Sequence, residues 1–253
     1  MTIKEALTKA TKKLETEKIA SASLDAELLL ALALKKSREF LFTYPEQKLT
    51  YLQRKKLEKL IKKRADQTPL SYLTGFKEFY GLSFIVSPKV LVPRPLTEEL
   101  VERALEELKS LKKGQNRPLK VAEIGTGSGC LIISLIKELQ KTEDLTAFEF
   151  YATDISKAAL KVAKKNAKKH EADNYITFLK GDLLKPLKNK KLDLILANLP
   201  YLTKEDVAKE GSIKKEPEGA LIGDYNNFFK QIDSLTYQPL IIYEDKGGIN
   251  LYS

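Results

Sequence analysis

The sequence predicts an α/β fold: a mostly parallel sheet with helices on both faces, preceded by a small helical bundle. Two observations lead to this prediction. From residue 119 onward, apolar runs of strand length alternate with amphipathic helical segments, and such alternation is typical of βαβ units. Earlier in the chain, apolar residues recur mainly at helical spacing. We therefore expect a helical domain over residues 1–67, a connector over 68–96 and the sheet domain over 97–253.

The helical domain is predicted from stripes of apolar residues. In the first helix they fall at intervals of three and four, at Ile3, Ala6, Leu7, Ala10 and Leu14. Residues 24–36 are apolar on nearly all sides, with acids in the first turn, where the helix dipole favours them. A later helix carries its own stripe, at Leu57, Leu60 and Ile61. Short amphipathic helices of this kind predict a bundle.

The connector over residues 68–96 breaks the helical pattern. It reads TPLSYLTGFKEFYGLSFIVSPKVLVPRPL, with aromatic and β-branched residues between glycines and prolines. This composition predicts a hairpin around Gly81. Thr97 follows as the expected N-cap of a helix that opens with Glu98 and Glu99.

The sheet domain is predicted from five apolar runs and two amphipathic segments. We expect strands at 119–124, 148–153, 175–180, 192–197 and 239–244, and helices at 130–139 and 157–169. The last of these runs is taken as the final strand. In an open parallel sheet, ligands bind beyond the carboxyl ends of the strands. The residues that end each strand are therefore the candidates for a functional site.

The composition limits the possible functions. One cysteine, Cys130, and one histidine, His170, exclude an internal disulfide and a cysteine or histidine metal site, so we expect no metal. No apolar stretch is long enough to cross a bilayer, and we expect a cytoplasmic monomer. The net charge of +10 suggests nucleic acid. Because the lysines lie in helical runs without a recognisable binding module, we interpret them as solvated helix faces and expect no stable nucleic-acid complex.

The first predicted strand ends in the glycine-rich stretch EIGTGSG, whose candidate binding residues are Glu123, Gly125, Thr126, Gly127, Ser128 and Gly129. Glycines let the backbone approach a ligand closely and adopt positive φ. A dinucleotide fingerprint would need glycine at position 130, where Cys130 stands. The observed spacing, opened by an acid, is the pattern of the S-adenosylmethionine pocket in class I methyltransferases. The alternative is a glycine-rich turn without a ligand.

Acids also end the next two strands. Asp154 follows the second strand, where a carboxylate can accept both hydroxyls of a ribose. Asp182 and Leu183 follow the third, where they can hold an adenine amine and ring. Either aspartate alone could be a helix cap or turn residue. With Glu123, three acids at three successive strand ends favour a binding site, and a carboxylate near a sulfonium cation is stabilising.

The fourth strand ends in the tetrapeptide Asn198-Leu199-Pro200-Tyr201. Enzymes that methylate planar NH₂ groups carry Asn/Asp/Ser-Pro-Pro-Tyr/Phe at this place. The Asn198 side-chain oxygen and the Leu199 carbonyl can accept the two N–H groups of such a nitrogen and aim its lone pair at a methyl group. Pro200 stiffens the turn, and the Tyr201 ring offers a face for a flat substrate. The alternative is an ordinary turn that ends a strand.

With these motifs, the chain resembles the HemK-type release factor glutamine methyltransferases over about residues 20–245. The matching pieces are the connector, the EIGTGSG loop, Asp154, ANLPYL and EPEGAL at 216–221. The resemblance implies a Rossmann-like class I sheet, S-adenosylmethionine as cofactor, and N5-methylation of the glutamine in the Gly-Gly-Gln loop of class 1 peptide release factors. It also implies cofactor contacts by Gly125–Gly129, Asp154, Asp182, Leu183 and Asn198, substrate contacts by Asn198–Tyr201, and substrate recognition by the helical domain.

The chain departs from the family pattern at three places. Leu199 replaces a proline, and Leu96 stands where an acid is usual. Residues 246–253 are too few for the helix and the antiparallel pair that close the family's sheet, so we expect the closing strands to be missing. Two other functions remain open: methylation of the adenine N6 amine in RNA or DNA, and a non-catalytic binding protein with a degenerate methyltransferase fold.

Overall fold

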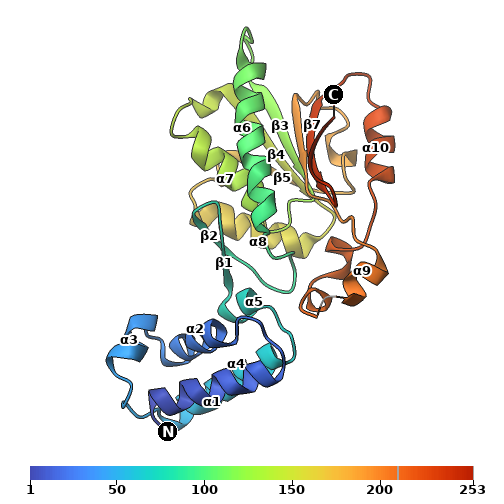
Figure 1. Cartoon of the computed structure of the whole chain (residues 1–253). Helices are drawn as coiled ribbons and strands as arrows, with labels where there is room; N and C mark the ends of the chain where they lie inside the picture. The colour runs from blue at the N-terminus through green and yellow to red at the C-terminus, as the bar shows by residue number, and fades with distance from the viewer. Residues whose placement is uncertain (210, 253) are drawn as a thin grey trace. The chain divides into compact units, whose positions relative to one another are not determined.

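A computed structural model describes residues 1–209 and 211–252, which form two compact units (Figure 1). The first unit contains residues 1–75 and 211–215. The second contains the rest of the described chain. The connector is therefore shared: its first part packs with the helices and its hairpin packs with the sheet.

The first unit is helical, as the apolar stripes predict. Its helices are α1 (Ile3–Thr16), α2 (Ala22–Leu34), α3 (Arg38–Thr43), α4 (Tyr51–Ala65) and α5 (Leu70–Thr74). Thr2 and Thr50 each begin a helix with a capping box, which pairs otherwise free amide groups of the first turn. The core contains the buried residues of the α1 stripe, and an ion pair of 2.6 Å between the buried Asp25 and the half-buried Arg64 joins α2 to α4.

The second unit contains a hairpin, a sheet and five α-helices among its described residues. The hairpin is β1 (Phe76–Phe79) and β2 (Leu82–Ile85). The helices are α6 (Glu98–Lys112), α7 (Cys130–Leu139), α8 (Lys157–Lys169), α9 (Lys204–Lys209) and α10 (Asn226–Asp233). The sheet strands are β3 (Leu119–Ile124), β4 (Phe148–Asp154), β5 (Ile176–Lys180), β6 (Leu194–Ala197), β7 (Leu240–Asp245) and β8 (Gly248–Tyr252).

The sheet has the order β5-β4-β3-β6-β7-β8, and all pairs are parallel except β7 with β8. The prediction that the closing strands are missing is wrong for one of them, because residues 248–252 form an antiparallel strand. A tight turn makes this possible: Asp245 accepts a hydrogen bond from the Gly247 amide, and Gly248 has a φ of 117°. The strand at 239–244 is therefore not the last.

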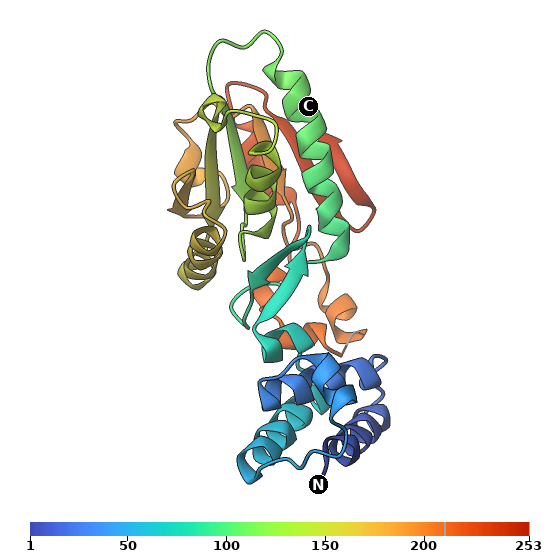
Figure 2. The same ribbon diagram turned by 90° about the vertical axis from the view of Figure 1, so that its left-hand side faces the viewer.

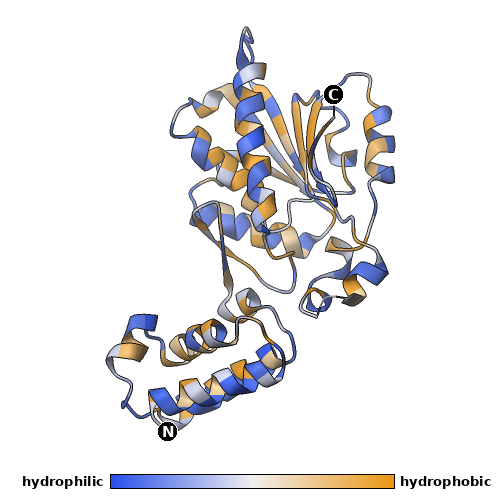
Figure 3. Cartoon of the chain, in the orientation of Figure 1, coloured by the Kyte–Doolittle hydropathy of each residue, from blue (hydrophilic) through white to orange (hydrophobic). Residues whose placement is uncertain are grey.

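Helices cover both faces of the sheet, as predicted. One apolar core joins α6, α7 and the hairpin to one face, and a second core joins α10 to the opposite face. Figure 2 shows the long helix α6 running along the strands. The strands are largely apolar in Figure 3, whereas α6 alternates between apolar and polar residues, as expected for a helix with one buried side. Within the described ranges, each helix is too short or too polar to cross a membrane.

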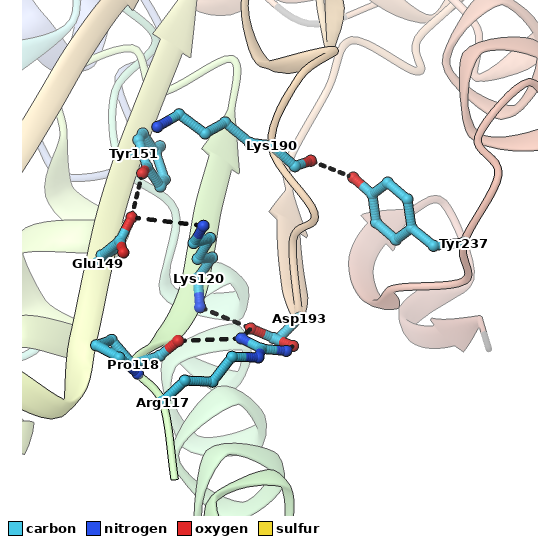
Figure 4. Close-up of polar contacts among 8 residues, drawn as sticks. All are labelled: Arg117, Pro118, Lys120, Glu149, Tyr151, Lys190, Asp193 and Tyr237. Atoms are coloured by element: carbon cyan, nitrogen blue, oxygen red, sulfur yellow. Dashed lines mark hydrogen bonds and ion pairs between the residues drawn. The ribbon is translucent and has the colours of Figure 1, made fainter. Parts of the chain in front are cut away.

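A cluster of polar contacts joins the amino end of β3 to the amino end of β6 (Figure 4). Arg117 donates two hydrogen bonds to the Asp193 carboxylate, at 2.8 and 2.7 Å, and the Lys120 amide donates a third at 2.8 Å. Nearby, Tyr151 donates to Glu149 on the same strand, β4. The contacts of Asp193 set the register of the two strands whose opposite ends carry Glu123 and Asn198.

We expect Asp193→Ala to lower the free energy of unfolding of the sheet unit by about 2 kcal/mol at pH 7, because hydrogen bonds to a charged group are lost and the Lys120 amide is left unpaired. Burial raises the pKa of Asp193, but hydrogen bonds from Arg117 and the Lys120 amide outweigh it and hold the pKa below the usual 3.8. The stabilisation is therefore present above that pH and is lost as the pH falls through the lowered pKa.

Urea unfolding followed by circular dichroism at pH 7 and pH 3 tests this. The matched control is Glu106→Ala, an exposed acid of α6 paired with Arg103, which should change the free energy by at most about 0.5 kcal/mol. An equal loss at both pH values would contradict the assigned role of the carboxylate.

Candidate functional site

A cavity of about 500 Å³ lies at the carboxyl ends of the parallel strands. β3 is the switch point of the sheet, because the chain continues to β4 on one side and returns to β6 on the other. The sequence-predicted residues that line the cavity are Glu123, Gly125, Thr126, Gly127, Ser128, Asp154, Asp182, Leu183, Asn198, Leu199 and Pro200. Of the other predicted residues, Gly129 and Tyr201 lie outside this lining in the described chain.

The glycine loop requires its glycines for two different reasons. Gly125, Gly127 and Gly129 have φ values of 74°, 53° and 78°, a region that favours glycine. A side chain at position 125 would also place its Cβ 2.8 Å from Leu199 Cδ2. The loop after β3 and the tetrapeptide after β6 are therefore packed directly against each other.

Three hydrogen bonds hold this loop in place. The Thr126 amide donates to the Thr153 carbonyl at 2.9 Å, and the Gly127 amide donates to Asp154 Oδ2 at 2.9 Å. The third comes from Asn166 on α8, whose Nδ2 donates to the Ser128 carbonyl at 2.8 Å. Asn166 is fully buried and also bonds both backbone groups of Ile85 in β2. It was not predicted from the sequence, because it lies in the lysine-rich stretch KKNAKK.

Glu123 is a buried acid at the end of β3. Its carboxylate accepts a hydrogen bond from the Thr126 hydroxyl. Burial raises the pKa of Glu123 to about 8, and the hydrogen bond from Thr126 lowers it only in part. Burial also raises the pKa of the neighbouring Cys130 thiol to about 12. Cys130 is therefore a packing residue rather than a nucleophile.

The two predicted aspartates occupy different environments. Asp154 is buried, and its two carboxylate oxygens accept the amides of Gly127 and Ser156, so it acts partly as the turn residue that was the alternative interpretation. Burial raises its pKa, and these hydrogen bonds oppose the rise. Asp182 is more exposed and pairs with Lys185 at 2.8 Å. Each carboxylate still has lone pairs to offer a ligand in the cavity.

Asn198 is held by its nitrogen. Its Nδ2 donates to Thr97 Oγ1 at 2.9 Å and to Glu244 Oε2 at 3.0 Å. The amide hydrogens are used by these contacts, and Oδ1 is the acceptor that the side chain can offer to a ligand. Thr97 was expected to cap α6 with its side chain, and that prediction is wrong: its hydroxyl donates to Glu244 at 2.6 Å.

Glu244 is the centre of this arrangement and was not predicted from the sequence. Its side chain is buried at the end of β7 and accepts hydrogen bonds from Thr97, Asn198 and, at 3.0 Å, the Tyr201 hydroxyl. Burial, and to a smaller extent the charge of Glu244 and its hydrogen bond, raise the pKa of Tyr201 to about 12. A signal was available, since PLIIYE is an apolar strand that ends in an acid like the others.

Tyr225 anchors the backbone of the tetrapeptide. Its hydroxyl accepts the Leu199 amide at 3.1 Å and donates to the Glu244 carbonyl at 2.6 Å. A proline at position 199 would have no amide hydrogen to pair. The hydroxyl of Tyr225 therefore satisfies the extra donor that Leu199 brings into a buried turn.

The EPEGAL segment is tied to the connector. Glu216 is buried, and its carboxylate accepts the Val92 amide at 2.9 Å and Arg94 Nη2 at 2.6 Å. Val92, Arg94 and Pro217 all line the cavity. Two segments that lie far apart in the sequence thus form one wall of the site.

A larger cavity, of about 600 Å³, belongs to the helical unit. It lies between α1 and α4 over an apolar floor that includes Ala6, Leu57 and Ile61, with lysines such as Lys9 and Lys62 at its edge. It contains none of the strand-end residues, so its size does not make it the catalytic site.

The fold and the strand-end cavity agree with comparisons to known proteins. Family models match residues 5–75, as a PrmC N-terminal domain, and residues 115–243, as a methyltransferase domain. The release factor glutamine methyltransferase of Koribacter versatilis (strain Ellin345) is 39% identical over 226 residues, which cover 88% of this chain and 76% of that protein. The one from Coxiella burnetii is 38% identical over 247 residues, covering 98% and 82%.

Solved structures of methyltransferases also match parts of the chain. The catalytic domain of hMettl16, in complex with a MAT2A 3′UTR hairpin, is 17% identical and overlaps with a TM-score of 0.47, covering 72% of this chain and 68% of that one.

The parallel sheet, the glycine loop after its central strand and the matching domain define an S-adenosylmethionine-dependent methyltransferase. Over the aligned residues, which make up most of both proteins, the two relatives are 39% and 38% identical to this chain. The chain belongs to the release factor glutamine methyltransferase family.

Burial raises the pKa of Glu123 from 4.5 to about 8. Between these two pH values, the folded protein therefore keeps a proton on Glu123 that the unfolded chain releases. The stability contributed by this group is therefore complete below about pH 4.5 and is lost as the pH rises through the folded pKa. The neutral variant Glu123→Gln lacks this loss. We expect its melting temperature to rise relative to that of the parent between pH 5 and pH 9.

Thermal unfolding of the cofactor-free protein measures the difference. Glu171→Gln, at an exposed acid just beyond α8, is the control and should follow the parent. A constant difference between Glu123→Gln and the parent over this pH range would show that burial does not control the proton at Glu123.

Proposed function

We propose that this protein transfers a methyl group from S-adenosylmethionine to the side-chain amide nitrogen of a glutamine, in the Gly-Gly-Gln motif of class 1 peptide release factors. One observation carries the proposal: Asn198 is held by its nitrogen, which leaves its carbonyl oxygen as an acceptor beside the glycine-loop cavity. Family membership and the names of the relatives support the choice of substrate. The reaction would take place in the cytoplasm, where release factors act.

The residues of the cavity fit the cofactor. Residues of the glycine loop line the cavity, together with acidic side chains at or just beyond the ends of β3, β4 and β5. Asp154 would hold the ribose hydroxyls, and Asp182 and Leu183 the adenine. Glu123 would lie near the positively charged sulfur, with Gly125–Gly129 and Asn198 also in contact with the cofactor. S-adenosylmethionine supplies an electrophilic methyl group on a positively charged sulfur.

The tetrapeptide would hold the other reactant. An amide nitrogen is a poor nucleophile because its lone pair is delocalised. Asn198 Oδ1 and the Leu199 carbonyl would accept its two N–H groups, which orients the nitrogen and meets the positive charge that develops on it. Pro200 stiffens this turn, and the ring of Tyr201, the next residue, would offer a face for the substrate's flat amide. Transfer then depends on position more than on a strong base.

The helical unit would recognise the release factor. Its residues 5–75 match a domain named for the family, and its fold contributes none of the residues that line the strand-end cavity. A role in holding the rest of the substrate is consistent with both facts. Residues 1–67 are thus proposed as the recognition domain and 97–253 as the methyltransferase domain, with 68–96 between them.

We expect Asn198→Ala to lower the rate of methyl transfer at least 100-fold, since an aimed acceptor at a developing charge is worth about this much. Cofactor affinity should change less than threefold. The measurement is mass spectrometry of the Gly-Gly-Gln peptide after a release factor is incubated with enzyme and cofactor.

Asn174→Ala, which removes an exposed amide before β5, is the matched control and should keep the parental rate. A parallel reaction with total RNA and S-adenosylmethionine labelled in its methyl group tests the adenine alternative. Label that enters RNA and never the release factor would overturn the proposed substrate.

Asp154→Ala should weaken cofactor binding about 10- to 100-fold, because a buried ribose would lose a charged acceptor and the Gly127 amide would lose its partner. Calorimetric titration with S-adenosylmethionine measures this, with Asp173→Ala at an exposed acid as the control. Unchanged affinity in Asp154→Ala would refute the ribose contact. A folded parent that binds no cofactor would point instead to a non-catalytic binding protein.

A further inference from the structure

We propose that Glu244 is a positioning residue that sets which atom of the Asn198 amide faces the cavity. The proposal rests on the proposed function, because it concerns the acceptor that would hold the substrate nitrogen. It concerns a residue that does not line the cavity itself and acts through Asn198.

The need for such a residue follows from the shape of an amide. The oxygen and nitrogen of a carboxamide are nearly equal in size, so packing alone cannot choose between the two orientations. Hydrogen-bond partners decide it. When Nδ2 faces Thr97 and Glu244, Oδ1 is free to accept a hydrogen bond from the substrate. In the opposite orientation Nδ2 would face the substrate N–H group, and the two donors would repel each other.

The contacts of Glu244 favour the productive orientation. A carboxylate offers only acceptors, and Asn198 Nδ2 lies 3.0 Å from Oε2. Thr97 completes the selection: its hydroxyl donates to the same oxygen at 2.6 Å, so its own oxygen is left to accept from Nδ2 at 2.9 Å. In the opposite orientation, Oδ1 would face the Glu244 carboxylate and the oxygen of a Thr97 hydroxyl whose hydrogen is already donated to that carboxylate.

The carboxylate is itself fixed on both sides. Ala197 pairs with Tyr243 in the sheet, which brings the end of β7 beside Asn198. The Glu244 carbonyl accepts the Tyr225 hydroxyl, the other carboxylate oxygen accepts Tyr201 at 3.0 Å, and Glu244 pairs with Ile249 of β8. Because only 1% of Glu244 is exposed, water cannot replace these donors.

The first test is Glu244→Gln, which keeps the shape but replaces a group that can only accept with an amide that can also donate, so the orientation of Asn198 is no longer imposed. We expect kcat for methylation of the release factor to fall at least 50-fold, while the affinity for S-adenosylmethionine changes less than threefold. The melting temperature is measured alongside, because a neutral amide forms weaker hydrogen bonds with the surrounding donors than a carboxylate does.

A second substitution separates orientation from folding. In the double variant Asn198→Asp/Glu244→Gln, one oxygen of the introduced carboxylate can accept from the new glutamine amide, and the other still faces the cavity as an acceptor. We expect the double variant to be at least tenfold more active than Glu244→Gln. Asn198→Asp alone sets two carboxylates against each other and should be less active than the double variant.

Thr97 gives an independent pair of variants. Thr97→Val removes the hydroxyl at nearly constant shape, and Thr97→Ser keeps it. We expect Thr97→Ser to be at least fivefold more active than Thr97→Val, with equal cofactor affinity. This comparison remains informative if the Glu244 variants fold poorly.

The closing experiment needs no reaction. In cofactor-free protein labelled with ¹⁵N-asparagine, the Asn198 side-chain signals are those that Asn198→Asp removes. We expect slow hydrogen exchange with water in the parent and at least tenfold faster exchange in Glu244→Gln. Unchanged exchange, or a double variant no more active than Glu244→Gln, would overturn the role of Glu244. A parent that shows protected signals but no methylation would instead contradict the proposed function.

Discussion

The parallel pairing of β3 with β6 is the constraint on which the site depends. It brings two loops from distant parts of the chain to one edge of the sheet, with Glu123 opposite Leu196 in the register. The glycine loop and the tetrapeptide then touch, as the close approach of Gly125 and Leu199 demonstrates. A cavity for the methyl donor and a turn that holds the methyl acceptor, placed side by side in this way, can serve one transfer reaction, because such a reaction depends mainly on the relative position of its reactants.

Buried acids organise the walls of this site. Glu244 binds three donors near the tetrapeptide, Glu216 joins the connector to the EPEGAL segment, and Asp154 fixes the glycine loop. Each acid is paired with donors from segments far away in sequence, as a buried carboxylate must be. The site is therefore held together by polar contacts that only the completed fold can make.

Much of the fold was predictable because hydrophobic periodicity reports local structure. The strand at 119–124 and the helices at 130–139 and 157–169 were predicted with their observed bounds. The errors arose where tertiary contacts decide. Thr97 has the residue type of a cap, but its hydroxyl is drawn to a buried carboxylate. The short strand β8 carries little pattern of its own and exists because β7 offers it an edge.

Residue types and their order along the chain were enough to establish the class of protein, since a glycine loop and acids at successive strand ends can be recognised without knowledge of distant contacts. They also indicated Asn198 as the residue to hold a planar nitrogen. The orientation of that amide became evident only from the folded chain, in which Thr97, Glu244 and, through the backbone, Tyr225 hold it and its neighbour. The reason is physical: hydrogen-bond partners far apart in sequence leave no periodic pattern, and their geometry arises only when the sheet has formed.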